Sequence, residues 1–148
     1  MRTLFDDRER AALHRRIDAL VPDAPRRWGR MSAHQAVCHL TDAIESAFDA
    51  DDEVPGTGLL ARQPLKWLVL AVLPWPKGTM ESPPRLLRRH PSTWDADVAA
   101  LHDAIDRLAA RDAGASWPAS DVFGRLSRGE WGQLLRTHLD HHLRQFGV

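Results

Sequence analysis

Apolar residues recur every three or four positions along most of this chain, which is the spacing of one buried face of an α-helix. The pattern predicts five helical segments, at about residues 6–20, 32–50, 59–73, 92–111 and from 127 to nearly the end of the chain. Strict alternation of apolar and polar residues, which indicates half-buried strands, is nearly absent. We therefore expect an all-α fold.

Local signals at the helix ends support this interpretation. Ser32 with Gln35, and Ser127 with Glu130, each form the Ser-x-x-Gln/Glu capping box that begins a helix. Proline and glycine mark the connections, and the connection at 77–91 is too short and too central to be a domain linker. Long helices joined in this way predict a helical bundle, whose core can hold a metal site built from facing helices.

Composition narrows the functional classes. The chain has no internal repeat, and residues 1–148 are expected to form one domain. Because 20 basic residues balance 20 acidic ones, neither nucleic acid nor an anionic membrane is an expected partner. The most apolar stretch, 65–75, is shorter than the roughly 20 residues that cross a bilayer, and the acid-rich N-terminus does not resemble a signal peptide. With Cys38 as the only cysteine, we expect a protein of the reducing cytoplasm.

The last helical segment contains the most informative pattern. His138 and His142 are four residues apart, so their imidazoles lie on one face of the helix, together with Trp131, Leu135 and Phe146. Two histidines within an apolar stripe need a polar partner, and a metal ion is the partner we predict. Imidazole suits zinc, nickel, copper and iron, and catalytic sites commonly use three protein ligands and leave one position open.

Neighbouring polar residues take lesser roles in this interpretation. His141 is turned about 100° from His142, toward the flank of the helix, which suggests a packing role or a contact with a ligand. Gln145 lies at the edge of the stripe, where it can orient a metal-binding histidine. Asp140 points to the opposite side and is expected to be solvated.

A third ligand must come from a facing helix, and four histidines are candidates. Spacing favours His39 on the second helical segment, followed by His34, which forms an i, i+4 pair with Cys38. His102 and His14, on the fourth and first segments, remain candidates for the third ligand, because spacing alone does not exclude them. Cys38 itself is expected to be a small core residue.

Three stretches carry a resemblance to a known family. They are Trp28-Gly-Arg-Met-Ser with the later Cys-His39-Leu, then Phe123-Gly-Arg-Leu-Ser-Arg-Gly-Glu-Trp131, then Thr137-His-Leu-Asp-His-His-Leu-Arg-Gln-Phe-Gly147. Together they resemble the DinB/YfiT-like superfamily, and more narrowly a branch catalogued mainly as a domain of unknown function. The closing His-x-x-His-His-x-x-Gln pattern is the most specific of these motifs.

The resemblance implies a DinB-like four-helix bundle with one additional short helix and long connections. It also implies a divalent metal, zinc or nickel, held by His39, His138 and His142. Characterised relatives include transferases and isomerases that use a low-molecular-weight thiol such as bacillithiol, mycothiol or glutathione. One departure is that Ser120-Asp121-Val122 stands where a His-Pro would be expected before Phe-Gly, so the role of that loop histidine is vacant or altered here.

Two functions follow as hypotheses. In the first, the protein is a metal-dependent thiol S-transferase or hydrolase acting on a small molecule, in which the metal converts a thiol or water into a nucleophile at neutral pH. Hydrolysis would also require a carboxylate as general base, for which Asp42 and Glu45 are candidates.

The alternative is a non-catalytic, metal-stabilised bundle. A closed structural site would recruit a fourth protein ligand such as His141 or His34. The apolar segment at 59–73 would then serve as an interaction surface, for example in a homodimer.

Overall fold

The computed structural model describes residues 2–49, 84–120 and 122–148. These residues form four α-helices, one 3-10 helix and two very short strands: α1 (Asp7–Asp18), α2 (Ala33–Glu45), η2 (Pro84–Leu87), α4 (Trp94–Ala110), β1 (Ala119–Ser120), β2 (Gly124–Arg125) and α5 (Arg128–Gln145). The prediction of a helical class is confirmed, with the small sheet as an exception. The predicted segment at 59–73 lies outside the described residues.

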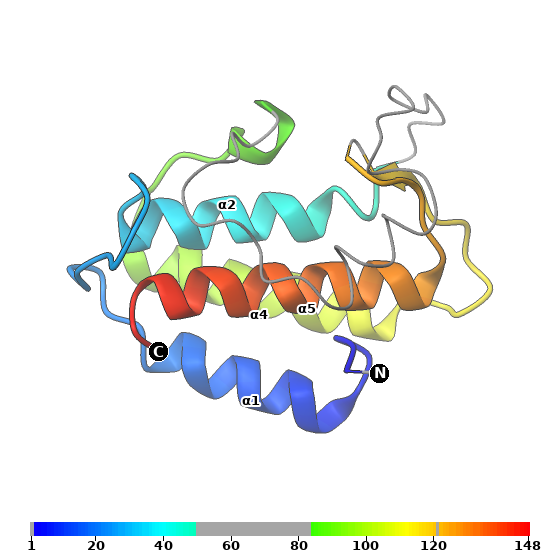
Figure 1. Cartoon of the computed structure of the whole chain (residues 1–148), viewed down its shortest axis with the longest axis horizontal. Coiled ribbons are helices and arrows are strands. Elements are labelled where there is room, and N and C mark those ends of the chain that lie inside the picture. The colour runs from blue at the N-terminus through cyan, green and yellow to red at the C-terminus, as the bar shows by residue number, and fades with distance from the viewer. Residues whose placement is uncertain (1, 50–83, 121) are drawn as a thin grey trace.

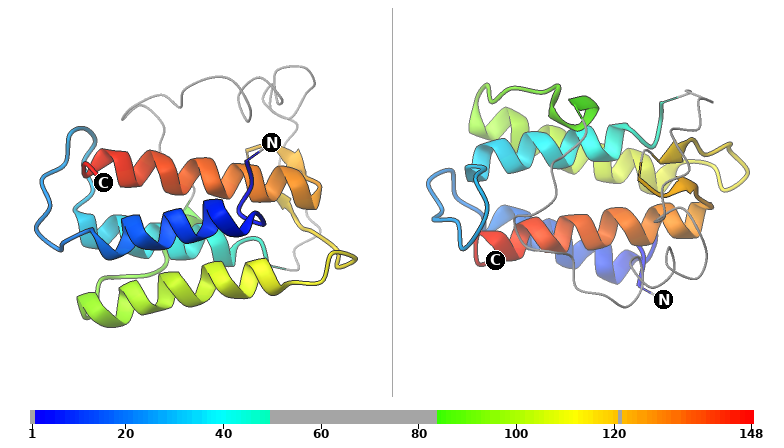
Figure 2. Two further views of the ribbon diagram at one scale, coloured as in Figure 1. Left: turned by 90° about the horizontal axis from the view of Figure 1, so that it is seen from below. Right: turned by 45° about the horizontal axis from the view of Figure 1, so that its top comes forward.

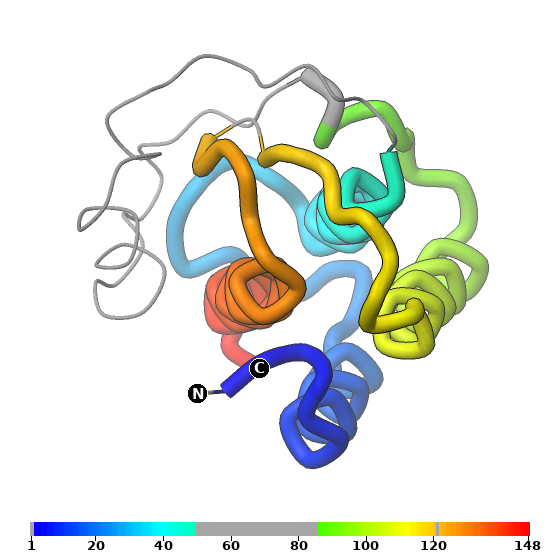
Figure 3. The backbone as a smooth tube through the Cα atoms, turned by 90° about the vertical axis from the view of Figure 1, so that its right-hand side faces the viewer, coloured from blue at the N-terminus to red at the C-terminus, as the bar shows by residue number. Residues whose placement is uncertain are grey.

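The four helices lie side by side (Figure 1). Helices α1 and α5 run in one direction and α2 and α4 in the other, as two further views show (Figure 2). Seen end-on, they occupy four corners, with α2 and α1 diagonally opposite and each in contact with both α4 and α5 (Figure 3). In the part of the chain that the structure describes, no helix is long and apolar enough to cross a membrane.

The predicted apolar stripes form the core between these helices. Large aliphatic side chains from all four helices are almost fully buried there, and the most enclosed are Ile17, Val37, Ile44, Leu101, Ile105, Leu108, Leu139 and Leu143. Trp131 is also buried, at 2% exposure. Trp94 is only half-buried at the start of α4.

Both predicted capping boxes are present. The Ser32 hydroxyl accepts from the Gln35 N–H while the Gln35 side chain accepts from the Ser32 N–H, and Ser127 and Glu130 make the same reciprocal pair. Each box satisfies N–H groups that have no partner within the helix. These two caps set where α2 and α5 begin.

Other boundaries differ from the prediction. Helix α2 ends at Glu45 rather than near residue 50, because the N–H groups of Ala47 and Phe48 bond three residues back, in turns. Helix α4 begins at Trp94 rather than Ser92, since the Ser92 N–H donates to the Asp97 carboxylate (2.8 Å) from outside the helix.

The loop expected at 112–126 contains the small antiparallel sheet. Ala119 pairs with Arg125 and Ser120 pairs with Gly124. Strands of two residues are too short to show an alternating pattern in the sequence, so the prediction of a plain loop was wrong here. The Trp131 indole N–H donates to the Pro118 carbonyl (3.0 Å) and thereby holds the sheet against the start of α5.

Candidate metal centre

Three of the predicted site residues come together where α2 faces α5. His39 projects from α2, and His138 and His142 project from α5, one turn apart. Their ring centroids form a nearly equilateral triangle with sides of 4.8, 5.0 and 4.9 Å. One ligand nitrogen from each ring lies within 4.8 Å of the others, and the Nε2 atoms of His39 and His138 are 3.0 Å apart.

Hydrogen bonds outside the triangle fix the tautomers of two of these rings. The Nδ1 of His39 lies 2.8 Å from the carbonyl oxygen of Leu86 in η2, and a carbonyl can only accept, so Nδ1 carries the proton. The Nδ1 of His142 lies 2.8 Å from Oε1 of Gln145 and donates to it. In both rings the Nε2 lone pair is therefore left facing the cluster, as it is in metal-binding histidines.

Gln145 is itself held in one orientation. Its amide N–H donates to the Trp28 carbonyl (2.7 Å), so the amide oxygen is the atom that faces His142. The predicted orienting role of Gln145 thus has a geometric basis, and the side chain is buried at 3% exposure. The connection before α2 is in turn anchored by the Arg27 N–H, which donates to the Gln145 backbone carbonyl (2.7 Å).

A glycine makes this close contact feasible. Gly29 has a φ of +75°, in the left-handed region that favours glycine. A Cβ at this position would lie 2.6 Å from Nε2 of Gln145, so any other residue here would displace the Gln145 amide. Sequence reasoning did not assign a role to Gly29 or to Leu86, because neither has chemistry of its own to offer a ligand.

Burial keeps the three imidazoles neutral. It lowers the pKa of His39 below its usual value and the pKa of His138 well below it, with the neighbouring rings adding to the effect at His138. Burial, followed by the charge of His39, lowers the pKa of His142 to about 3. Neutral rings are the form that binds metals, so this environment favours ligation over protonation.

The donor set fits a divalent transition metal. Three imidazole nitrogens match the ligand preference of zinc, nickel, copper and iron. Two Zn–N bonds of about 2.0–2.1 Å at a tetrahedral angle place the nitrogens about 3.3 Å apart. The His39 to His138 distance of 3.0 Å is close to that separation. Among the described residues, this group therefore offers three protein ligands that could hold a metal ion.

A cavity of about 400 Å³ borders the cluster at His39. Its described lining residues include Arg30 and Arg89 and no acidic residue, so its charged groups are basic. The Arg89 guanidinium also lies 3.5 Å from the Asp42 carboxylate, which offsets part of that charge. A small molecule with a negative group would fit this approach to the histidines better than a cationic one.

His141 and Asp140 lie beside the cluster rather than in it. The His141 ring packs edge-on against His142 (5.2 Å between centroids) and against Trp28 (5.7 Å), in line with the predicted flank position. The expectation that Asp140 is merely solvated was wrong. Its carboxylate accepts from Arg16 of α1 (2.7 Å) and pairs with Arg144 (3.1 Å), because α1 presents an arginine to that face.

His34, the second choice for the third ligand, takes part in a different group. Its Nε2 donates to the Asp97 carboxylate of α4 (2.7 Å), and one ligand atom each from His34, Cys38 and Asp97 lie within 4.8 Å of one another. Cys38 is buried, as predicted, and burial together with the Asp97 charge raises the pKa of its thiol to about 11. Asp97 of α4 accepts hydrogen bonds from His34 of α2 and from Ser92. These bonds explain the group as a connection between α2 and α4.

The structure also shows the surroundings of the remaining candidate residues for the site. Asp42 accepts from the Arg89 backbone N–H (2.8 Å) and Glu45 pairs with Arg107, so arginines engage both proposed bases. The Ser120 hydroxyl, at the position of the expected loop histidine, accepts from backbone N–H groups of its own turn. Asp121 lies outside the described residues. His14 and His102 meet each other on the opposite side of the molecule.

The fold and the site define a helical protein with a three-histidine cluster that could hold a metal ion. The sequence model of one protein family, described as a protein of unknown function (DUF1569), matches residues 4–147. This match covers nearly the whole chain, and the protein therefore belongs to that family. No curated protein and no solved structure matches the chain.

Proposed function

We propose that this protein binds one divalent metal ion, zinc or nickel, through the Nε2 atoms of His39, His138 and His142. The observation that carries the proposal is the pair of outward hydrogen bonds, from His39 to Leu86 and from His142 to Gln145. Each bond places the ring proton on Nδ1 and directs an Nε2 lone pair into the triangle. A packing role alone does not require two rings to share that orientation.

We further propose that the arrangement of α1, α2, α4 and α5 is a DinB-like four-helix bundle. The resemblance noted in the sequence and the placement of the three histidines on α2 and α5 support this assignment. The membership of a family of unknown function is compatible with it. We expect the protein to act in the cytoplasm, where its single thiol stays reduced.

The chemistry proposed for the site is transfer to or from a small thiol. A bound divalent ion supplies Lewis acidity, which lowers the pKa of a thiol or water and makes it nucleophilic at neutral pH. Arg30 and Arg89, on the lining of the adjoining cavity, would bind carboxylates of such a thiol or of its substrate. The buried rings keep their orientation without competition from solvent, since both Nδ1 protons are already engaged.

Metal content tests the binding step. We expect the purified wild type to carry one equivalent of zinc or nickel at this site, and His39→Ala, His138→Ala and His142→Ala to lose most of it. His90→Ala is the matched control, since His90 is an exposed histidine on the same cavity and should leave the metal in place. If none of the three variants lowers the bound metal, the proposal is wrong.

A separate screen tests the reaction. Metal-loaded protein is combined with bacillithiol, mycothiol or glutathione and a generic electrophile, and we expect one thiol to give a rate above background that His39→Ala abolishes. Metal binding without activity toward any pairing would favour the non-catalytic alternative, a metal-stabilised bundle. The dimer surface predicted for that alternative, at 59–73, lies outside the described residues.

A further inference from the structure

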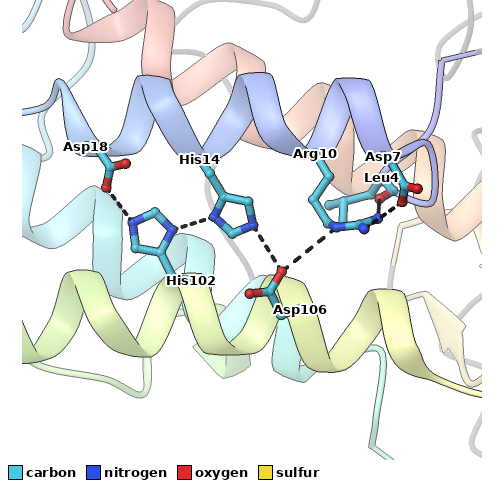
Figure 4. A network of polar contacts seen from close by, with 7 residues as sticks. All are labelled: Leu4, Asp7, Arg10, His14, Asp18, His102 and Asp106. Carbon is cyan, nitrogen blue, oxygen red and sulfur yellow. Dashed lines mark hydrogen bonds and ion pairs between the residues drawn. The ribbon is translucent and has the colours of Figure 1, made fainter.

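Two histidines that the three-histidine cluster does not use face each other across α1 and α4. The rings of His14 and His102 are stacked, with 4.7 Å between centroids and 25° between planes. Their Nδ1 atoms point at one another at a distance of 2.5 Å (Figure 4). The α1–α4 contact lies across the molecule from the α2–α5 contact, so this pair is separate from the cluster described above (Figure 3).

A carboxylate holds the outer nitrogen of each ring. Nε2 of His14 lies 3.1 Å from Asp106, and Nε2 of His102 lies 2.9 Å from Asp18. Carboxylates accept hydrogen bonds, so each Nε2 is the protonated nitrogen of its ring. With one proton on each ring, both Nδ1 atoms then carry lone pairs that face each other. Two facing lone pairs repel, and the arrangement is satisfied only by a cation between them.

The surrounding charges indicate what kind of cation this is. Arg10 pairs with Asp7 (2.7 Å) and approaches Asp106 (3.9 Å), while Asp18 contacts only His102 in this network (Figure 4). Asp18 and Asp106 are the carboxylates that touch the rings, so two negative charges adjoin the pair, and Arg10 approaches only one of them. A divalent ion matches the charge of both carboxylates, whereas a single shared proton matches only one.

We propose that His14 and His102 form a second metal site, in which both Nδ1 atoms bind one divalent transition-metal ion such as Zn²⁺. Asp18 and Asp106 orient the rings from behind, which is the carboxylate–histidine–metal arrangement of known sites. The Nδ1 atoms must separate from 2.5 Å to about 3.3 Å to accept two Zn–N bonds.

Both side chains are 23% exposed, so water can complete the coordination. Because one ligand comes from α1 and the other from α4, the bound ion ties these two helices together.

Zinc stoichiometry tests this proposal. Metal-stripped full-length protein is titrated with Zn²⁺ by calorimetry, and we expect two ions per chain for the wild type and one for His14→Gln and for His102→Gln. His90→Gln, the same change at an exposed histidine outside both groups, should still bind two. His39→Gln should retain the second ion, so the failure of either site is seen separately.

A second measurement needs no variant and guards against misfolding. In wild-type protein labelled with ¹⁵N-histidine, saturating Zn²⁺ should shift the Nδ1 resonances of His14 and His102 while their Nε2 protons stay in place. If zinc leaves both Nδ1 resonances unchanged, or if His14→Gln and His102→Gln bind as many ions as the wild type, the proposal is overturned. The pair would then share a proton only.

Discussion

The contact between Gly29 and Gln145 gives a sharp prediction, because Gly29 is not itself a ligand. In Gly29→Ala, the new Cβ would lie 2.6 Å from Nε2 of Gln145. The flexible amide is the group that can move, and its movement breaks the bonds to the Trp28 carbonyl (2.7 Å) and to His142 (2.8 Å). His142 then loses the partner that directs its Nε2 into the cluster.

The expected magnitude follows from that lost orientation. Removing a partner that orients a metal ligand typically lowers metal affinity about 10- to 100-fold, or about 1.4–2.7 kcal/mol. Alanine at a φ of +75° adds about 1–2 kcal/mol of backbone strain, which lowers the free energy of unfolding. Zinc affinity is measured by competition with a chromophoric chelator, and stability by urea unfolding of the metal-stripped protein.

Two variants serve as controls. Gly129→Ala makes the same change in α5, where the added Cβ meets nothing within 4 Å, and should leave zinc affinity unchanged. Gln145→Leu removes the orienting amide directly and should match Gly29→Ala in affinity. The double variant should then be no worse than either single variant. Folded Gly29→Ala protein with wild-type zinc affinity would refute the orienting role of Gln145.

Three further predictions concern pH, metal removal and the thiol. In the metal-stripped protein, His39, His138 and His142 have lowered pKa values, so between about pH 6.5 and 3 the unfolded chain binds more protons than the folded one. The free energy of unfolding should thus fall as pH falls in this window, by up to about 1.4 kcal/mol per pH unit for each histidine that stays neutral in the folded state. Urea unfolding at several pH values measures this, and a free energy of unfolding that does not change with pH would contradict the prediction. Removing bound metal with a chelator should lower Tm, since zinc at 100 times its Kd adds about 2.7 kcal/mol to the free energy of unfolding. An unchanged Tm would show that the folded state binds no metal. Cys38, buried and with its thiol pKa raised to about 11, should resist alkylation at pH 7.5 until urea unfolds the protein, whereas rapid labelling of the native state would place it at an accessible site.

The periodicity of residues along the sequence was sufficient to predict features that lie within a single helix. The four-residue spacing of His138 and His142 predicted one shared face, and their rings do lie together, 4.9 Å apart. The capping boxes at Ser32 and Ser127 predicted two helix starts correctly. These features depend on residues close in sequence, where geometry follows from the helix itself.

Features that depend on contacts with a neighbouring helix or loop could not be predicted from the sequence. Spacing gave His39 only a lead among four candidate histidines, and the family resemblance was needed to select it as the third ligand. The partner of His39 is a backbone carbonyl of Leu86, which any residue type could supply. Asp140 was expected to be solvated because a helical wheel shows its direction but not the Arg16 that α1 presents there.

The central claim is that three histidines hold one divalent ion, and X-ray absorption at the zinc edge tests it most directly. The measurement uses His14→Gln protein loaded with one equivalent of Zn²⁺, so that the second proposed site does not contribute. We predict three imidazole nitrogens at about 2.0–2.1 Å and one further light ligand from solvent. A sulfur ligand, or a spectrum that is the same in His39→Ala protein, would contradict the account.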